Sequence, residues 1–171
     1  MAMQYARDTL LDGGRVIWVC EETPNAERFS QLFKDVNVIA LSKIHLLACG
    51  EAISGGIDDA RKLSMELTPQ LIVIDDWTPR IGRANNITIN SLRQLKSNVD
   101  DHCPILITSA LYSDASGESE WKIRGEKLLE EIGAITWMLT INEGGAVQER
   151  ILNYCGNEKR LAISDEGFVI H

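Results

Sequence analysis

The sequence lacks the features of several large protein classes. It has no apolar run near the roughly 20 residues that a membrane-spanning helix needs, and the opening stretch MAMQYARDTLLDGG has no apolar core of the kind found in signal peptides. It also contains no internal repeat, low-complexity tract or proline-rich linker. We therefore expect one globular domain in the cytoplasm, without a membrane partner.

The chain has fewer basic than acidic residues. The chain has 17 Lys and Arg against 25 Asp and Glu, which gives a formal net charge of -8. A protein that follows a nucleic-acid backbone needs a cationic face, so we expect no nucleic-acid partner. Apolar residues make up 44% and charged residues 25% of the chain, which is an ordinary composition for a folded domain with its own core.

Motifs for bound metals or phosphates are also missing. The four cysteines, Cys20, Cys49, Cys103 and Cys155, are widely spaced without a C-x-x-C pair, so zinc ligation or a disulfide framework is not expected. The three histidines are equally scattered. The stretch GEAISGG has neither G-x-G-x-x-G nor G-K-[ST], so it does not indicate a phosphate-binding loop.

What the sequence does contain is an alternation of short apolar runs and helical patterns. The apolar runs predict buried strands at residues 15–20, 37–42, 71–75, 104–110 and 134–139. Apolar residues at helical spacing predict helices between the strands, the last of them in EGGAVQERILNYC. The stretch that precedes Gly55 and Gly56 is hard to place, and we expect the double glycine to break it.

This order predicts an α/β fold. Strands that are buried on both faces and alternate with helices are typical of a doubly wound, five-stranded parallel sheet of the flavodoxin-like (βα)5 kind. The domain would cover residues 15–155, after an N-terminal extension at residues 1–14. A C-terminal tail at residues 156–171 alternates around DEG, which indicates a β-hairpin.

Acidic and hydroxyl side chains stand at the ends of three predicted strands. Glu21 and Glu22 follow the first strand, Asp75 ends the third, and Thr108 and Ser109 end the fourth. Ligands of such sheets bind beyond the C-terminal ends of the strands. Carboxylates are ligands that suit Mg²⁺, and a carboxylate can also accept a phosphoryl group. One interpretation is a Mg²⁺ site formed by Glu21, Glu22 and Asp75. The alternative is that Glu21 and Glu22 interact favourably with the dipole of the helix that follows them.

Four local patterns resemble the receiver domain of two-component response regulators. RVIWVCEE is similar to the first receiver strand with its acidic pair, and PQLIVIDDWTP to the third strand, whose phosphoacceptor stands four residues before a proline; this implies Asp75 as acceptor. CPILITSA implies a switch hydroxyl at Ser109, and GAITWMLT implies an aromatic switch residue at Trp137.

The chain departs from the receiver pattern in one decisive place. Receivers carry a Lys at the end of the fifth strand, where this sequence has Thr140. The resemblance therefore implies a degenerate pseudo-receiver, not an enzyme, that signals by protein–protein interaction without normal phosphorylation. Its partner would be a histidine kinase or a downstream signalling protein, with a homodimer left open. If exposed, Trp77 would be a partner contact, with packing against the neighbouring loop as the alternative.

Two other functions stay open from the sequence. The first is a phosphorylation-competent single-domain response regulator in a phosphorelay, with Asp75 as acceptor. The second is a flavodoxin-like, Mg²⁺-dependent nucleotide-binding domain or enzyme that uses the same acids. Structural roles also remain open, with Ser109 bonding a backbone group and Trp137 packing in the core.

Overall fold

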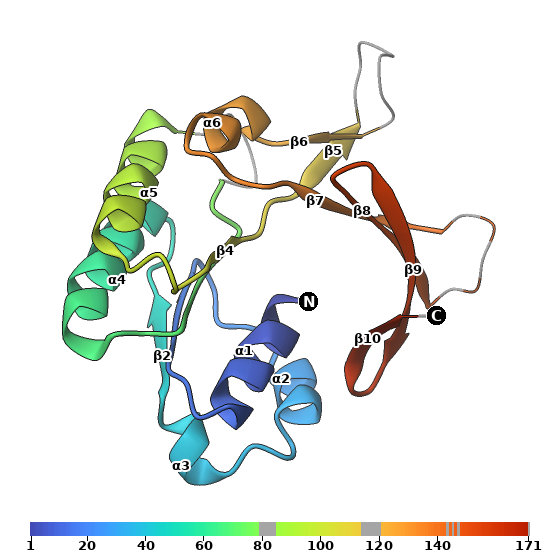
Figure 1. Ribbon diagram of the computed structural model, residues 1–171, viewed down its shortest axis with the longest axis horizontal. Helices are drawn as coiled ribbons and strands as arrows, with labels where there is room; N and C mark the ends of the chain where they lie inside the picture. Colours follow the sequence, from blue (N-terminus) through green and yellow to red (C-terminus); the bar gives the residue numbers. More distant parts are fainter. Residues whose placement is uncertain (79–84, 114–120, 143, 145, 147, 171) are drawn as a thin grey trace.

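The computed structural model describes residues 1–78, 85–113, 121–142, 144, 146 and 148–170. A parallel sheet with helices on both faces fills one side of the view in Figure 1, and a curved antiparallel sheet lies on the other side. No helix in these ranges is long and apolar enough to cross a lipid bilayer.

The parallel sheet has four strands. They are β1 (Val16–Cys20), β2 (Ile44–Ala48), β3 (Leu71–Asp75) and β4 (Ile105–Ile107), in the order β2-β1-β3-β4. All three pairings are parallel. Every residue of β1 and the first four residues of β3 are buried, as expected for central strands that have helices on both faces.

Five helices cover the two faces of this sheet. One face carries α1 (Ala2–Leu11), α2 (Ala26–Leu32) and α3 (Val38–Leu41), and the other carries α4 (Ile53–Leu67) and α5 (Asn86–Asn98). The buried residues accordingly form two separate hydrophobic cores, one on each side of the sheet.

Successive residues of β1 divide between the two cores. Ile17 and Val19 pack with α4 and α5, whereas Val16, Trp18 and Cys20 pack with α1 and α2. This division follows from the two-residue period of a strand, which sends neighbouring side chains to opposite faces. A one-residue shift of β1 would therefore exchange the contents of both cores.

The second half of the chain is mostly antiparallel. A four-stranded sheet has the order β10-β9-β8-β7, and its strands are β7 (Trp137–Ile141), β8 (Glu149–Tyr154), β9 (Asn157–Ser164) and β10 (Gly167–Ile170). The chain between β4 and β7 forms a small ribbon and a short helix, namely β5 (Leu111–Ser113), β6 (Trp121–Ile123) and α6 (Glu126–Glu131).

The α/β class is confirmed, but the five-stranded flavodoxin-like sheet is wrong. The run predicted as the fifth parallel strand, residues 134–139, becomes β7, which pairs antiparallel with β8. The predicted last helix becomes β8. Its Ile151 and Tyr154 satisfy a helical spacing, but β8 is bonded on both sides, to β7 and β9, and this pairing overrides the helical pattern. Val147 lies outside the described residues.

Two further predictions about the first half are wrong. The run at residues 37–42 contains the short helix α3, because Asn37 Oδ1 accepts a hydrogen bond of 2.9 Å from the Ala40 N–H and caps it. The strand β2 comes directly afterwards, in the stretch that was hard to place. The double glycine does not break the chain, since Gly55 and Gly56 both lie inside α4.

Three strands and the C-terminal hairpin are as predicted. β1, β3 and β4 fall within residues 15–20, 71–75 and 104–110. β9 and β10 pair antiparallel with Ser164 opposite Gly167, so the turn falls within DEG. The predicted N-terminal extension holds α1, whose Ala6 and Leu10 are buried against the sheet.

The two glycines of α4 provide a matched test of how closely this helix packs on the sheet. A Cβ on Gly56 would lie 2.8 Å from Cys49 Sγ and 2.8 Å from Val19 Cγ1, whereas a Cβ on Gly55 would have nothing within 4 Å. We expect Gly56→Ala to lower the free energy of unfolding by about 1–3 kcal/mol through overpacking. Gly55→Ala should raise it by about 0.5–1 kcal/mol, because alanine favours the helix. Urea denaturation measures both, and equal effects would contradict the packing.

Candidate functional site

Asp75 and Thr108 form a hydrogen-bonded pair at the C-terminal edge of the parallel sheet. Asp75 ends β3, and Thr108 follows β4, the neighbouring strand. The Thr108 hydroxyl donates to Asp75 Oδ1 at 2.7 Å and accepts from the Asp76 N–H at 2.7 Å. The Thr108 main chain is bonded as well, to Ile74 and Trp77. Both side chains are therefore held in place at the C-terminal edge of the sheet.

The turn after Asp75 sends the chain back into the core. Asp76 has a φ of 57°, in the left-handed region that Asp adopts more readily than most residues. Trp77 follows it and is completely buried with the residues of α4 and α5. The prediction that Trp77 is an exposed partner contact is therefore wrong, and packing is its role.

A cavity of about 400 Å³ opens beside the Asp75–Thr108 pair. The first turn of α1 lines one side, with Trp18 and Arg28 next to it. The remaining wall comes from the β9–β10 hairpin, through Ile163, Gly167 and Phe168. Residues from the beginning, middle and end of the chain thus meet around one carboxylate.

The surroundings of this cavity favour an anion next to the carboxylate. α1 begins at its wall, and the helix start carries no side-chain cap. A helix N-terminus has unsatisfied N–H groups and a partial positive charge, both of which attract anions such as phosphate. Arg28 adds a full positive charge, and its guanidinium donates to the Ser164 carbonyl at 2.8 Å.

The buried indole of Trp18 also lines the cavity. Its side chain is 1% exposed, and within the described residues its Nε1 has no hydrogen-bond partner. A buried donor without an acceptor is costly in a native protein.

The predicted three-carboxylate metal site is not assembled. Glu21 and Glu22 follow β1, next to β3, where Cys20 pairs in register with Asp75. Across the part of the chain that the structure describes, no three His, Cys, Asp or Glu side chains come together in a metal-binding group. Asp75 as a ligand of Mg²⁺ stays a prediction.

The hydroxyl that meets Asp75 belongs to Thr108 and not to Ser109. Ser109 Oγ donates to the Arg124 carbonyl at 3.2 Å. The receiver pattern favoured Ser109 because of the alanine after it. The signal for Thr108 lies in strand register, since Ile74 pairs with Ile107 and the next residues on the two strands are Asp75 and Thr108.

Trp137 and Thr140 lie in the antiparallel sheet, on β7. Trp137 is 45% exposed, and its ring lies 6.4 Å from that of Tyr5 and 5.8 Å from that of Tyr154, centroid to centroid. Thr140 pairs with Ile151 of β8. Because β7 is not a fifth parallel strand, the receiver positions assigned to both residues do not exist in this fold.

Comparison with known proteins finds a shared fold outside the receivers. No family model matches the chain, and no curated protein matches it. Among solved structures it is similar to the KaiC-like protein PH0186 from the hyperthermophilic archaeon Pyrococcus horikoshii OT3, with a TM-score of 0.64 and 15% identity. The similarity covers 97% of this chain and 79% of that one. At this identity the likeness establishes a shared fold.

This likeness overturns the receiver assignment. The likeness extends over nearly the whole chain, including the antiparallel strands that receivers do not have. The predicted role as a two-component signalling domain and the prediction that the chain is not an enzyme are corrected with it.

The Thr108 hydroxyl should be essential to the organisation of the strand ends. Thr108→Val keeps the shape of the side chain but leaves Asp75 Oδ1 and the Asp76 N–H without their partner, so we expect the free energy of unfolding to fall by about 1–3 kcal/mol. Thr108→Ser retains the hydroxyl and should lose less. Chemical denaturation of both variants measures this, and a Val variant as stable as the Ser variant would count against the bridge.

Thiol reactivity should follow burial. Burial, with a smaller contribution from the Asp75 charge, raises the pKa of Cys20 to about 11, and burial raises that of Cys103 to about 11. Because thiolates are the reactive form, neither should react with a disulfide reagent at pH 8, whereas the exposed Cys155 should react at once. Counting labelled sites by mass spectrometry before and after denaturation checks this; fast labelling of Cys20 in the folded protein would contradict it.

Proposed function

We propose that the chain is a nucleotide-binding domain of the ATPase type, which binds a nucleotide together with Mg²⁺ in the cavity beside Asp75. The observation that carries the proposal is the Asp75–Thr108 pair, which faces the same cavity as the N-terminus of α1. The fold shared with a KaiC-like protein supports the same class of ligand.

The position of the cavity supports a ligand site. In parallel α/β sheets, ligands bind beyond the carboxyl ends of the strands, and Asp75 and Thr108 stand at those ends of β3 and β4. The volume of about 400 Å³ lies within the range of small-molecule sites. Apolar walls with a few convergent polar groups are also typical of such sites.

The donor set fits Mg²⁺ better than a metal held by protein alone. Mg²⁺ keeps several waters and is usually bound by one or two carboxylates together with substrate phosphates. Asp75 supplies one carboxylate, which Thr108 orients. The ion would supply charge neutralisation for the phosphates of the nucleotide. A site with so few protein ligands agrees with the absence of a three-ligand group among the described residues.

Within this chain, the groups suited to phosphate are the first turn of α1 and Arg28, since the sequence has no G-x-x-x-x-G-K-[ST] motif. Helix N–H groups bind phosphate oxygens through hydrogen bonds and the helix dipole. The guanidinium of Arg28 matches phosphate geometry.

Hydrolysis would need a base for the attacking water. Glu21 and Glu22 follow β1, whose last residue is in register with Asp75. Neither residue lines the cavity beside Asp75, so the proposal covers binding of the nucleotide and assigns no base for hydrolysis. A cytoplasmic location, a homodimer and a protein partner remain predictions beside this proposal.

Nucleotide binding can be measured directly by calorimetry with ATP or ADP and Mg²⁺. We expect the parent chain to bind, and Asp75→Asn to weaken binding by about tenfold or more, which corresponds to about 1.4 kcal/mol. The weaker binding follows from losing the metal-binding carboxylate while an amide oxygen still accepts from Thr108.

Asp59→Asn is the matched control, because Asp59 lies on α4 across the sheet and its exposed side chain pairs with Lys62. It should bind as the parent does. A folded parent chain that binds neither nucleotide with Mg²⁺ would refute the proposal.

A further inference from the structure

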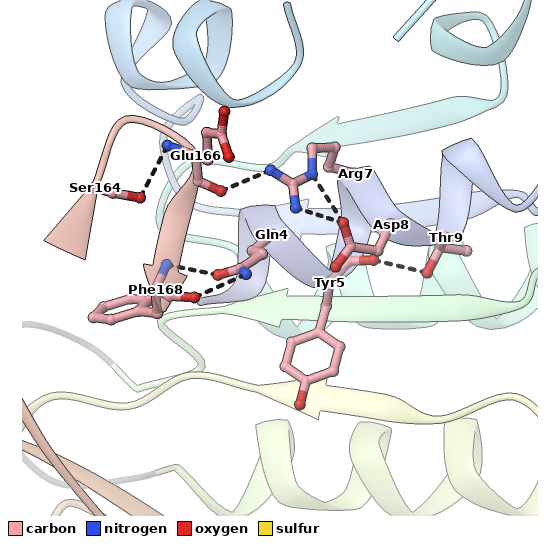
Figure 2. Close-up of polar contacts among 8 residues, drawn as sticks. All are labelled: Gln4, Tyr5, Arg7, Asp8, Thr9, Ser164, Glu166 and Phe168. Atoms are coloured by element: carbon pink, nitrogen blue, oxygen red, sulfur yellow. Dashed lines mark hydrogen bonds and ion pairs between the residues drawn. The ribbon is translucent and has the colours of Figure 1, made fainter. Parts of the chain in front are cut away.

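One strand of the hairpin that lines the cavity, β10, is bonded to a glutamine of α1. Figure 2 shows the Gln4 side chain lying against the main chain of Phe168. Its Nε2 donates to the Phe168 carbonyl at 3.2 Å, and its Oε1 accepts from the Phe168 N–H at 2.9 Å. One side-chain amide therefore satisfies both main-chain groups of Phe168, as a neighbouring strand would.

This pairing completes an otherwise unpaired edge. Across the described part of the chain, β10 is the outermost strand of its sheet and pairs with β9 alone. An edge strand of four residues has few hydrogen bonds of its own, so such a segment is among the first to open. The Gln4 amide occupies the outer edge at the point where Phe168 and Gly167 line the cavity.

The glycine beside Phe168 is required for this approach. Gly167 has a φ of +117°, and a Cβ built on it would lie 2.6 Å from Gln4 Oε1. Any other residue would be strained there and would push the amide away. The sequence of the hairpin is thus fitted to the side chain of Gln4.

Two arginines support the turn of the hairpin but do not reach Phe168. Arg7 donates to the Glu166 carbonyl at 2.7 Å, as Figure 2 shows, and Arg28 donates to the Ser164 carbonyl at 2.8 Å. They hold the tip of the hairpin to α1 and α2. The strand that forms the cavity wall is held by Gln4.

We propose that Gln4 is a positioning residue, which fixes Phe168 as the wall of the cavity and so couples closure of the hairpin to ligand binding beside Asp75. A ligand that packs against Phe168 stabilises the closed hairpin. The Gln4 amide holds Phe168 in the cavity wall before that ligand binds. We call the contact between Gln4 and Phe168 the clamp. The identification of the ligand as a nucleotide with Mg²⁺ rests on the proposed function, whereas the clamp does not depend on it.

Hydrogen exchange in the free protein tests the clamp. Gln4→Met keeps the length of the side chain and removes both hydrogen bonds, so amides of residues 167–170 should exchange roughly tenfold faster. Amides of β8 should keep their rates. Gln94→Met is the control, because Gln94 is exposed on α5, across the parallel sheet. Unchanged exchange of β10 in Gln4→Met would overturn the proposal.

The variant Gln4→Glu distinguishes the loss of one hydrogen-bond donor from a general loosening of the hairpin. At pH 7 its carboxylate still accepts from the Phe168 N–H but cannot donate to the Phe168 carbonyl. Protonation restores a donor, so protection of β10, corrected for intrinsic exchange, should recover as the pH falls toward the ordinary carboxyl pKa of about 4.3. Gln4→Met should show no such recovery. Equal pH profiles in the two variants would overturn the donor role.

Saturating ADP with Mg²⁺ tests the coupling. In the parent chain, bound nucleotide should slow exchange of β10 further, and Gln4→Met should bind roughly tenfold more weakly, because its binding-competent form is less populated. Binding that leaves both β10 exchange and the Gln4→Met affinity unchanged would overturn the coupling. A parent chain that binds no nucleotide would refute the proposed function, whereas the exchange results in the free protein would still decide the clamp.

Discussion

The arrangement of the site depends on β1 and β3 being buried on both faces. Two adjacent parallel strands in this setting cannot shift against each other, because a shift of one residue would exchange the contents of the two cores. Their fixed register places Cys20 beside Asp75. β4 then adds Thr108 at the same level. The polar pair at the sheet edge is thus positioned by apolar packing several residues away.

Some of this could be predicted from the sequence, for reasons that are clear in particular elements. The runs RVIWVC and LIVID are short, apolar and rich in branched residues, and strands buried on both faces have few other signatures. The hairpin around DEG combines alternation with turn residues. The place of Asp75 at the end of β3 could be predicted because it closes the apolar run LIVID.

Other parts could not be predicted because long-range pairing decided them. ILNY in β8 fits helical spacing, and only its neighbours β7 and β9 make it a strand. NVIAL is apolar enough for a strand, but Asn37 caps a helix there and the sheet takes its second strand from the residues that follow. Gly56 belongs in a helix only because α4 lies against Cys49 and Val19. Phe168 and Gln4 gave no signal, since their contact crosses nearly the whole chain.

The contact between Gln4 and Phe168 joins residues that are 164 positions apart in the sequence. Closing so large a loop costs entropy that local contacts cannot offset, so contacts of this kind usually form late in folding. During synthesis, α1 and the parallel sheet can be in place while β10 is still inside the ribosome. The cavity beside Asp75 therefore stays open until the hairpin has emerged, and its wall is among the last contacts of this fold to form.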